Sequence, residues 1–111
     1  MGGALTQGDV YWYTFKGPDK RRPVLILTRN SAIPFLTSLT VAPITSTIRS
    51  IPTEVVLSPE DGLFARCAVN LDNIQTVQKA RIGAFVEHLS PQRMSEVARA
   101  IEFALGFDAL G

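Results

Sequence analysis

The sequence has few of the residues that metal centres and disulfide frameworks require. It contains one cysteine, Cys67, and one histidine, His88. No internal disulfide can form, and the soft ligands are too few for a structural zinc site. We expect Cys67 to be a small buried side chain in a reducing compartment, and the protein to be cytoplasmic. No glycine-rich phosphate loop, nucleophile elbow or metal-ligand cluster is present, so no cofactor is expected.

Long hydrophobic runs and a strong net charge are also missing. The longest apolar runs, such as residues 24–27, are far shorter than the roughly 18 residues of a membrane helix, so we expect a soluble protein without a membrane partner. The net charge is +1, yet residues 1–50 hold six Lys and Arg against two Asp and Glu, and residues 51–111 hold five against eight. This asymmetry fits a polyanion-binding surface and, equally, an ordinary scatter of solvated charges.

The length and apolar content indicate a small mixed fold. A chain of 111 residues that is 46% hydrophobic predicts one domain over residues 1–111. Segments rich in β-branched and aromatic residues predict strands at 10–15, 24–28, 39–44, 53–57, 66–70, 73–77 and 84–89. Such close spacing is typical of a small barrel or a strongly bent antiparallel sheet.

A single helix is predicted near the C-terminus. Ser90 is an N-cap residue type, Pro91 suits the first helical position, and Gly106 is a typical C-terminal stop. Apolar residues at helical spacing predict a stripe that covers the sheet: Met94, Val97, Ala98, Ile101, Ala104 and Leu105. The predicted fold class is therefore α+β.

A hairpin register suggests where chemistry could occur. Antiparallel pairing of residues 24–28 with 39–44 can match apolar partners: Val24 with Pro43, Leu25 with Ala42 and Ile26 with Val41. The same register sets Arg22 opposite Thr45, with Cβ atoms roughly 4.5–5.5 Å apart. A one-residue slip would move one of the two to the other face.

An arginine beside a threonine suits phosphodiester chemistry. A guanidinium can grip phosphate oxygens with two hydrogen bonds and neutralise charge that grows in the transition state, and a hydroxyl can donate to the same phosphate. The alternative is that Arg22 is an exposed loop charge and Thr45 merely a residue with high strand propensity.

Several segments carry a family resemblance in their order and spacing: residues 8–12, 22–27, 41–49, 54–57, 62–63 and 71–79. Together they resemble the MazF/PemK-type endoribonuclease toxins, over nearly everything from Gly8 to about Leu105. The resemblance implies an SH3-like, partly open barrel of antiparallel strands closed by a C-terminal helix. It also implies a homodimer, and a cognate antitoxin protein as partner.

The resemblance implies a reaction and its residues. Arg22 and Thr45 match the residues implicated in metal-independent cleavage of single-stranded RNA. In that reaction the ribose 2′-hydroxyl attacks the adjacent phosphate and leaves a 2′,3′-cyclic phosphate and a 5′-hydroxyl. Candidate RNA-binding residues are Lys16, Lys20, Arg21, Ser46, Arg49, Asn73 and Gln75. The loop before Arg22 is shorter than the family pattern, which leaves the target sequence open.

Two other functions stay open at this point. One is a non-catalytic toxin of the same fold, similar to CcdB, which binds DNA gyrase. The other is a nucleic-acid-binding barrel without cleavage activity. Only the nuclease interpretation needs Arg22 and Thr45 together.

Overall fold

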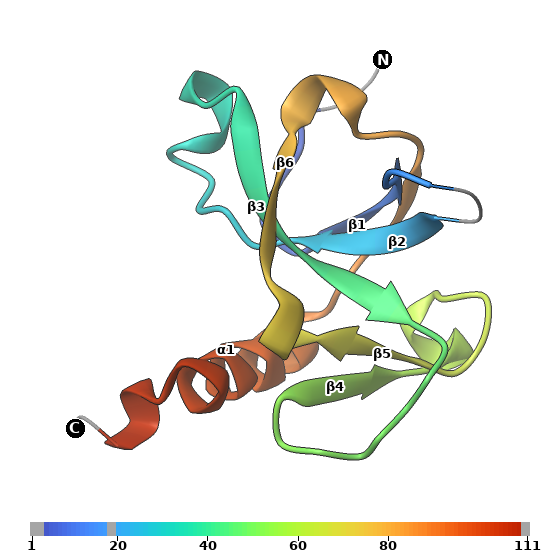
Figure 1. Ribbon diagram of the computed structural model, residues 1–111, viewed down its shortest axis with the longest axis vertical. Helices are drawn as coiled ribbons and strands as arrows, with labels where there is room; N and C mark the ends of the chain where they lie inside the picture. The colour runs from blue at the N-terminus through green and yellow to red at the C-terminus, as the bar shows by residue number, and fades with distance from the viewer. Residues whose placement is uncertain (1–3, 18–19, 110–111) are drawn as a thin grey trace.

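The computed structural model describes residues 4–17 and 20–109. Its strands are β1 (Asp9–Thr14), β2 (Arg21–Ile26), β3 (Ser38–Thr45), β4 (Glu54–Leu57), β5 (Cys67–Asn70), β6 (Gln75–Gln78) and β7 (Phe85–His88). The helix α1 (Pro91–Leu105) follows them (Figure 1). Short 3₁₀ turns are η1 (Ile33–Phe35), η2 (Pro59–Asp61), η3 (Leu71–Asn73), η4 (Lys79–Arg81) and η5 (Phe107–Ala109).

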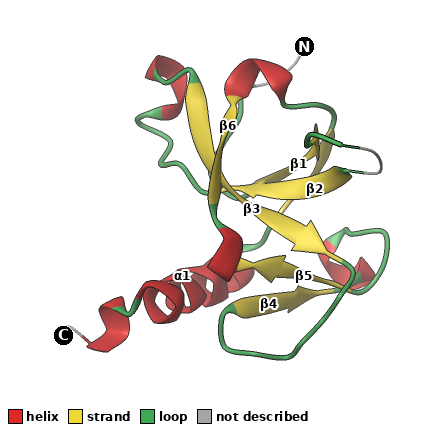
Figure 2. Cartoon of the chain, viewed as in Figure 1, coloured by secondary structure: helices red, strands yellow, loops and turns green. Residues whose placement is uncertain are grey.

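The strands form one curled antiparallel sheet in the order β4-β5-β3-β2-β1-β7, and β6 also pairs with β3. Figure 2 shows this sheet as a partly open barrel, with α1 lying at the end near β4 and β5. The arrangement confirms the predicted α+β fold with a C-terminal helix. Within the described residues, no helix is long and apolar enough to cross a membrane.

The long strand β3 joins the two halves of the sheet. Its first half pairs with β6, from Ser38 to Val41, and its end pairs with β5, from Ile44 to Thr45. Pro43 lies where the partner on that edge changes, so its missing N–H interrupts no continuous ladder there. Pro43 lies inside β3, at this change of partner.

Both faces of the β2–β3 hairpin are buried, which explains its continuous apolar runs. Leu25, Ala42 and Ile44 pack in the cluster that α1 covers through Val97 and Ala100. Val24, Ile26 and Val41 pack on the other face, inside the curl of the sheet. Because both faces exclude water, the register of these strands is strongly specified.

The helix begins and ends where the sequence predicts. The Ser90 hydroxyl accepts a hydrogen bond from the backbone N–H of Arg93 at 3.2 Å. Gly106 takes the left-handed conformation, with a φ of 76° at which a side chain would add strain. The predicted stripe needs one correction: Ala98 and Leu105 are exposed, and Ala100 is buried in their place.

Candidate functional site

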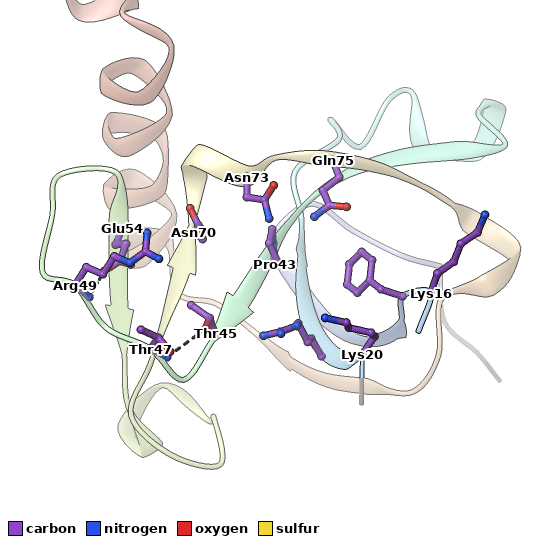
Figure 3. A pocket seen from close by; sticks show the side chains of 12 residues that line it. Lys16, Lys20, Pro43, Thr45, Thr47, Arg49, Glu54, Asn70, Asn73 and Gln75 are labelled. Atoms are coloured by element: carbon purple, nitrogen blue, oxygen red, sulfur yellow. Dashed lines mark hydrogen bonds between the residues drawn. The ribbon is translucent and has the colours of Figure 1, made fainter. Parts of the chain in front are cut away.

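A cavity of about 440 Å³ opens at the rim of the sheet, where β2 begins and β3 ends (Figure 3). Its size is typical of ligand sites in proteins. Its lining residues come from the β1–β2 connection, the ends of β2 and β3, the β3–β4 connection, and the segment from β4 to β6. They are Phe15, Lys16, Lys20, Arg22, Pro43, Thr45, Thr47, Arg49, Glu54, Asn70, Asn73 and Gln75.

The hairpin register brings Arg22 and Thr45 to this cavity together. The structure pairs Val24 with Pro43, as the sequence predicts, and both neighbouring pairs also match. The ladder ends at Val24 and Pro43; the same register continued by two residues would set Arg22 opposite Thr45, and both side chains line the cavity. Each is half-buried, so the packed strand ends restrain them while leaving one side open.

The hydroxyl oxygen of Thr45 already accepts one hydrogen bond. Its Oγ1 accepts the backbone N–H of Thr47 at 3.1 Å, the bond drawn in Figure 3. A hydroxyl has one proton to donate and two lone pairs, so this bond leaves the proton of Thr45 available to a ligand in the cavity. The turn after β3 therefore orients a donor.

The β3–β4 connection is held by Glu54. Its Oε1 accepts the backbone N–H groups of Arg49 at 2.9 Å and of Ser50 at 3.2 Å. Ser50 has a positive φ of 56°, which costs energy for a non-glycine residue and needs such support. The carboxylate thus fixes the loop that carries Thr47 and Arg49.

The cavity has an excess of positive charge. Lys16, Lys20, Arg22 and Arg49 line it with a single carboxylate, that of Glu54. In the described part of the chain, none of these four cations forms an ion pair. The cavity is therefore suited to a ligand with several negative charges.

The opposite wall carries amides. Asn70, Asn73 and Gln75 face the cavity from the segment between β5 and β6 (Figure 3). Side-chain amides offer both donors and acceptors, which can read the hydrogen-bonding edge of a base. Sequence reasoning named Asn73 and Gln75 but missed Asn70, whose place follows from its pairing with Glu54 across β4 and β5.

Seven of the nine residues predicted from the sequence line this cavity, and two do not. Arg21 lies over the ring of Trp12 with its guanidinium carbon 4.0 Å from the ring centroid. Ser46 lines a separate, smaller cavity. Successive residues of a strand point to opposite faces, so Arg21 turns away from Arg22 on β2. Ser46 follows the last residue of β3. The sequence offered no signal for five other lining residues: Phe15, Pro43, Thr47, Glu54 and Asn70.

The histidine and the cysteine lie outside this cavity. His88 Nδ1 is 2.7 Å from Asp9 Oδ1, which ties β7 to β1. Burial, followed by the same Asp9 carboxylate, raises the pKa of Tyr11. Cys67 is buried as predicted, and burial followed by the nearby Asp61 carboxylate raises the pKa of its thiol. Among residues 4–17 and 20–109, no cluster of His, Cys, Asp and Glu could hold a metal ion.

Comparisons with known proteins show what the chain is similar to. The family model of PemK-like, MazF-like toxins of type II toxin–antitoxin systems matches residues 6–105. The chain is 42% identical to endoribonuclease MazF3 of Mycobacterium tuberculosis over 90 residues, which cover 81% of this chain and 87% of that protein.

Solved structures show the same likeness. Toxin MazF-mt6 of Mycobacterium tuberculosis superposes with a TM-score of 0.81 at 38% identity, covering 88% of this chain and 96% of that chain. A mycobacterial endoribonuclease, solved in complex with its cognate antitoxin, gives a TM-score of 0.83 at 31% identity, covering 93% and 96%.

Proposed function

The chain belongs to the PemK/MazF toxin family of type II toxin–antitoxin systems, and on this premise we propose that it is an endoribonuclease toxin that cleaves single-stranded RNA. The observation that carries the proposal is the meeting of Arg22 and Thr45 in one positively charged cavity, from two strands whose register is fixed by packing on both faces.

The cleavage is an internal transfer at phosphorus. The ribose 2′-hydroxyl attacks the adjacent phosphate, the bond to the 5′-oxygen breaks, and the products are a 2′,3′-cyclic phosphate and a 5′-hydroxyl. The Arg22 guanidinium stabilises the negative charge that grows on the non-bridging oxygens. A guanidinium stays protonated at neutral pH, so this role is electrostatic. Thr45 donates its hydroxyl proton to the same phosphate, and the bond from Thr47 fixes its direction.

The remaining lining residues bind the RNA strand. Lys16, Lys20 and Arg49 attract the phosphates on either side of the cleaved bond. Asn73 and Gln75 read base edges from the amide wall, with Asn70 beside them. The short loop before Arg22 limits contacts from that side, so we assign the sequence preference mainly to the amides.

The same positive cavity supports a protein partner. A relative has been solved with its cognate antitoxin, and we infer that an antitoxin with an acidic segment covers this cavity and blocks RNA. Following the family resemblance, we further propose a homodimer, to be measured by light scattering. Its RNA substrate and its antitoxin place its action in the cytoplasm.

Cleavage of a labelled RNA in the presence of EDTA tests the proposed activity. The wild-type protein should give discrete fragments that end in a cyclic phosphate. Arg22→Ala and Thr45→Ala should each reduce the rate at least 100-fold, the usual effect of losing one transition-state donor. Arg99→Ala on the exposed face of α1 and Thr76→Ala on β6 are matched controls, and both should keep full activity.

Two results would contradict the proposal. If the RNA stays intact but binds tightly, the protein is a nucleic-acid-binding barrel. If Arg22→Ala cleaves like the wild type, the activity resides elsewhere. The gyrase-binding alternative is not favoured, because the relatives that match over most of the chain are endoribonucleases.

A further inference from the structure

A second surface lies on the other face of the β2–β3 hairpin. Phe64, in the connection between β4 and β5, stacks on Trp12 of β1 with ring centroids 5.4 Å apart and planes inclined by 26°. Arg21 of β2 lies against the same Trp12 ring. The connection from β4 to β5 curls past the end of β3 to reach this position (Figure 1). We call Trp12, Arg21, Phe64 and Arg66 the aromatic patch.

A small cavity lies beside this patch and shares one lining residue, Thr45, with the candidate active site. It has a volume of about 140 Å³, with an apolar floor that includes Ile44 and Leu63 and a polar rim of Ser46 and Arg66. Phe64 forms one wall, and Thr45 lines this cavity as well as the larger one. The threonine assigned to the phosphate is the last residue of β3, so it lies between the two cavities at the end of this strand.

Phe64 is a solvent-exposed phenylalanine with an aromatic partner. Its side chain is 71% exposed, although a phenylalanine loses favourable burial energy when it faces water. Its ring is nonetheless held in a fixed orientation by the stack on Trp12. A preset aromatic face beside a guanidinium matches a nucleotide, whose base is flat and whose phosphate is an anion.

We propose that the small cavity is a subsite for the nucleotide that adjoins the scissile phosphate, with its base stacked on Phe64 and its outer phosphate bound by Arg66. The RNA strand then passes Thr45, with one nucleotide in each cavity. This inference rests on the proposed function and deepens it. It also gives a role to Arg21 and Ser46, which lie here rather than in the larger cavity.

Removal of single bases from the substrate tests the subsite. RNAs with an abasic nucleotide on either side of the cleaved bond are compared with intact RNA, using wild-type protein and Phe64→Ala. Phe64→Ala should raise KM about tenfold with little change in kcat, because a stacked base is held equally before and during the reaction. In the wild type, the RNA that lacks the base bound in the subsite should raise KM by the same factor. With Phe64→Ala, which has already lost the stack, this RNA should give no further increase in KM.

Three further variants separate stacking from structure. Phe64→Tyr should keep the wild-type KM, and Phe64→Leu, which keeps apolar area but no aromatic face, should behave as Phe64→Ala. Phe35→Ala removes an 85% exposed phenylalanine from η1 and should change nothing. A KM that is equal in Phe64→Ala and the wild type overturns the subsite while leaving the nuclease intact.

Fluorescence gives a readout that does not require cleavage. Trp12 is the only tryptophan in the chain, so its emission reports on this patch alone. An RNA with a 2′-deoxy nucleotide at the cleaved bond cannot react, and it should quench Trp12 in the wild type and less in Phe64→Ala. Quenching without any cleavage of normal RNA would keep the subsite and remove the proposed nuclease. If Phe64→Ala weakens only the binding of an antitoxin, the patch is a protein-docking surface and the subsite is wrong.

Discussion

At the scale of the residue, the proposed chemistry depends on one hydroxyl group, that of Thr45. Thr45 accepts from Thr47 and keeps its proton for the ligand. A donor that is oriented before the substrate arrives needs no reorganisation during the reaction, which is the main source of electrostatic stabilisation in enzymes. The turn at the end of β3 thus contributes to the proposed cleavage through one backbone hydrogen bond, which orients the Thr45 hydroxyl.

Substitution at Thr45 separates the hydroxyl from the shape of the side chain. Thr45→Ser keeps the hydroxyl and should retain kcat within about tenfold, whereas Thr45→Val, of similar shape, should lower kcat by 100-fold or more. Single-turnover cleavage measures both, and circular dichroism confirms the fold. Equal rates for the valine and serine variants would remove the hydroxyl from the mechanism.

The residue scale also shows what the sequence could predict of the site. Arg22 and Thr45 could be paired from a register that apolar matching specifies on both faces. Arg21 and Ser46 are the sequence neighbours of these two residues, but Arg21 faces the opposite side of β2 and Ser46 lies past the end of β3. Glu54 and Asn70 were not predicted, because only the pairing of β4 with β5 brings these two residues together at the larger cavity.

At the scale of the element, local signals placed α1 well. The cap at Ser90, the proline after it and the left-handed Gly106 are features of backbone geometry that act within a few residues. Which helix face is buried depends on the sheet against which it packs. The predicted stripe consequently erred at its margins, at Ala98 and Leu105, while its centre at Val97 is buried.

The N-cap of α1 provides a stability test. Ser90→Ala removes the acceptor for the Arg93 N–H and should lower the free energy of unfolding by about 1 kcal/mol. Ser95→Ala, at an exposed position inside the same helix, should be neutral or slightly stabilising, since alanine is the better helix former. Urea unfolding of both variants measures the difference. Equal losses would mean that the cap contributes nothing.

The strands were predicted in number and order, and each end lies within three residues of its predicted position. The sequence places the sixth strand at 73–77, whereas β6 begins at Gln75 because the chain first makes the turn η3. β2 begins at Arg21, ahead of its apolar run, because β1 supplies a partner for its polar start. Ends depend on the neighbouring strand, which periodicity does not reveal.

At the scale of the whole molecule, an ion pair links the sheet to the helix. Arg93 of α1 donates from Nε to Asp61 Oδ1 of η2 at 3.0 Å and also to Glu96. The hydrogen bond from Arg93 lowers the pKa of Asp61, and Asp61 in turn raises the pKa of Arg93. The Asp61 carboxylate therefore binds its proton less readily in the folded protein than in the unfolded chain.

This ion pair makes stability depend on pH in acid. The lowered pKa of Asp61 contributes stability at pH values above about 4, and the contribution is lost as the pH falls through the folded pKa. Asp61→Asn should lower the free energy of unfolding by about 1 to 2 kcal/mol at pH 7. The difference from the wild type should shrink below pH 4.

Asp108→Asn, in the exposed turn η5, is the control and should change little at either pH. Denaturant melts at pH 7 and pH 3 provide the comparison. If the free energies of unfolding of the wild type and Asp61→Asn differ by the same amount at both pH values, the charge of the carboxylate is not involved.

The distribution of charge over the molecule sets how RNA binding responds to salt. Four cations around the larger cavity should release about four counterions from a single strand, which gives a slope of about −3 for the logarithm of the binding constant against the logarithm of salt concentration. Lys20→Gln removes one of the four cations, so about one counterion fewer should be released and the slope should become correspondingly less steep. Titration of a non-cleavable RNA at several salt concentrations measures it, and a flat response would show that the cavity is not the binding surface.

The hairpin described above also has a practical consequence. The stretch between β2 and β3, which is exposed at residues 29–31, separates the guanidinium from the hydroxyl in the sequence: Arg22 precedes it and Thr45 follows it. A chain divided in that stretch should give two fragments, neither of which has ribonuclease activity. The apolar faces of β2 and β3 should cause the two fragments to reassociate. A toxin that harms the cell expressing it could thus be prepared as two inactive fragments and assembled by mixing them.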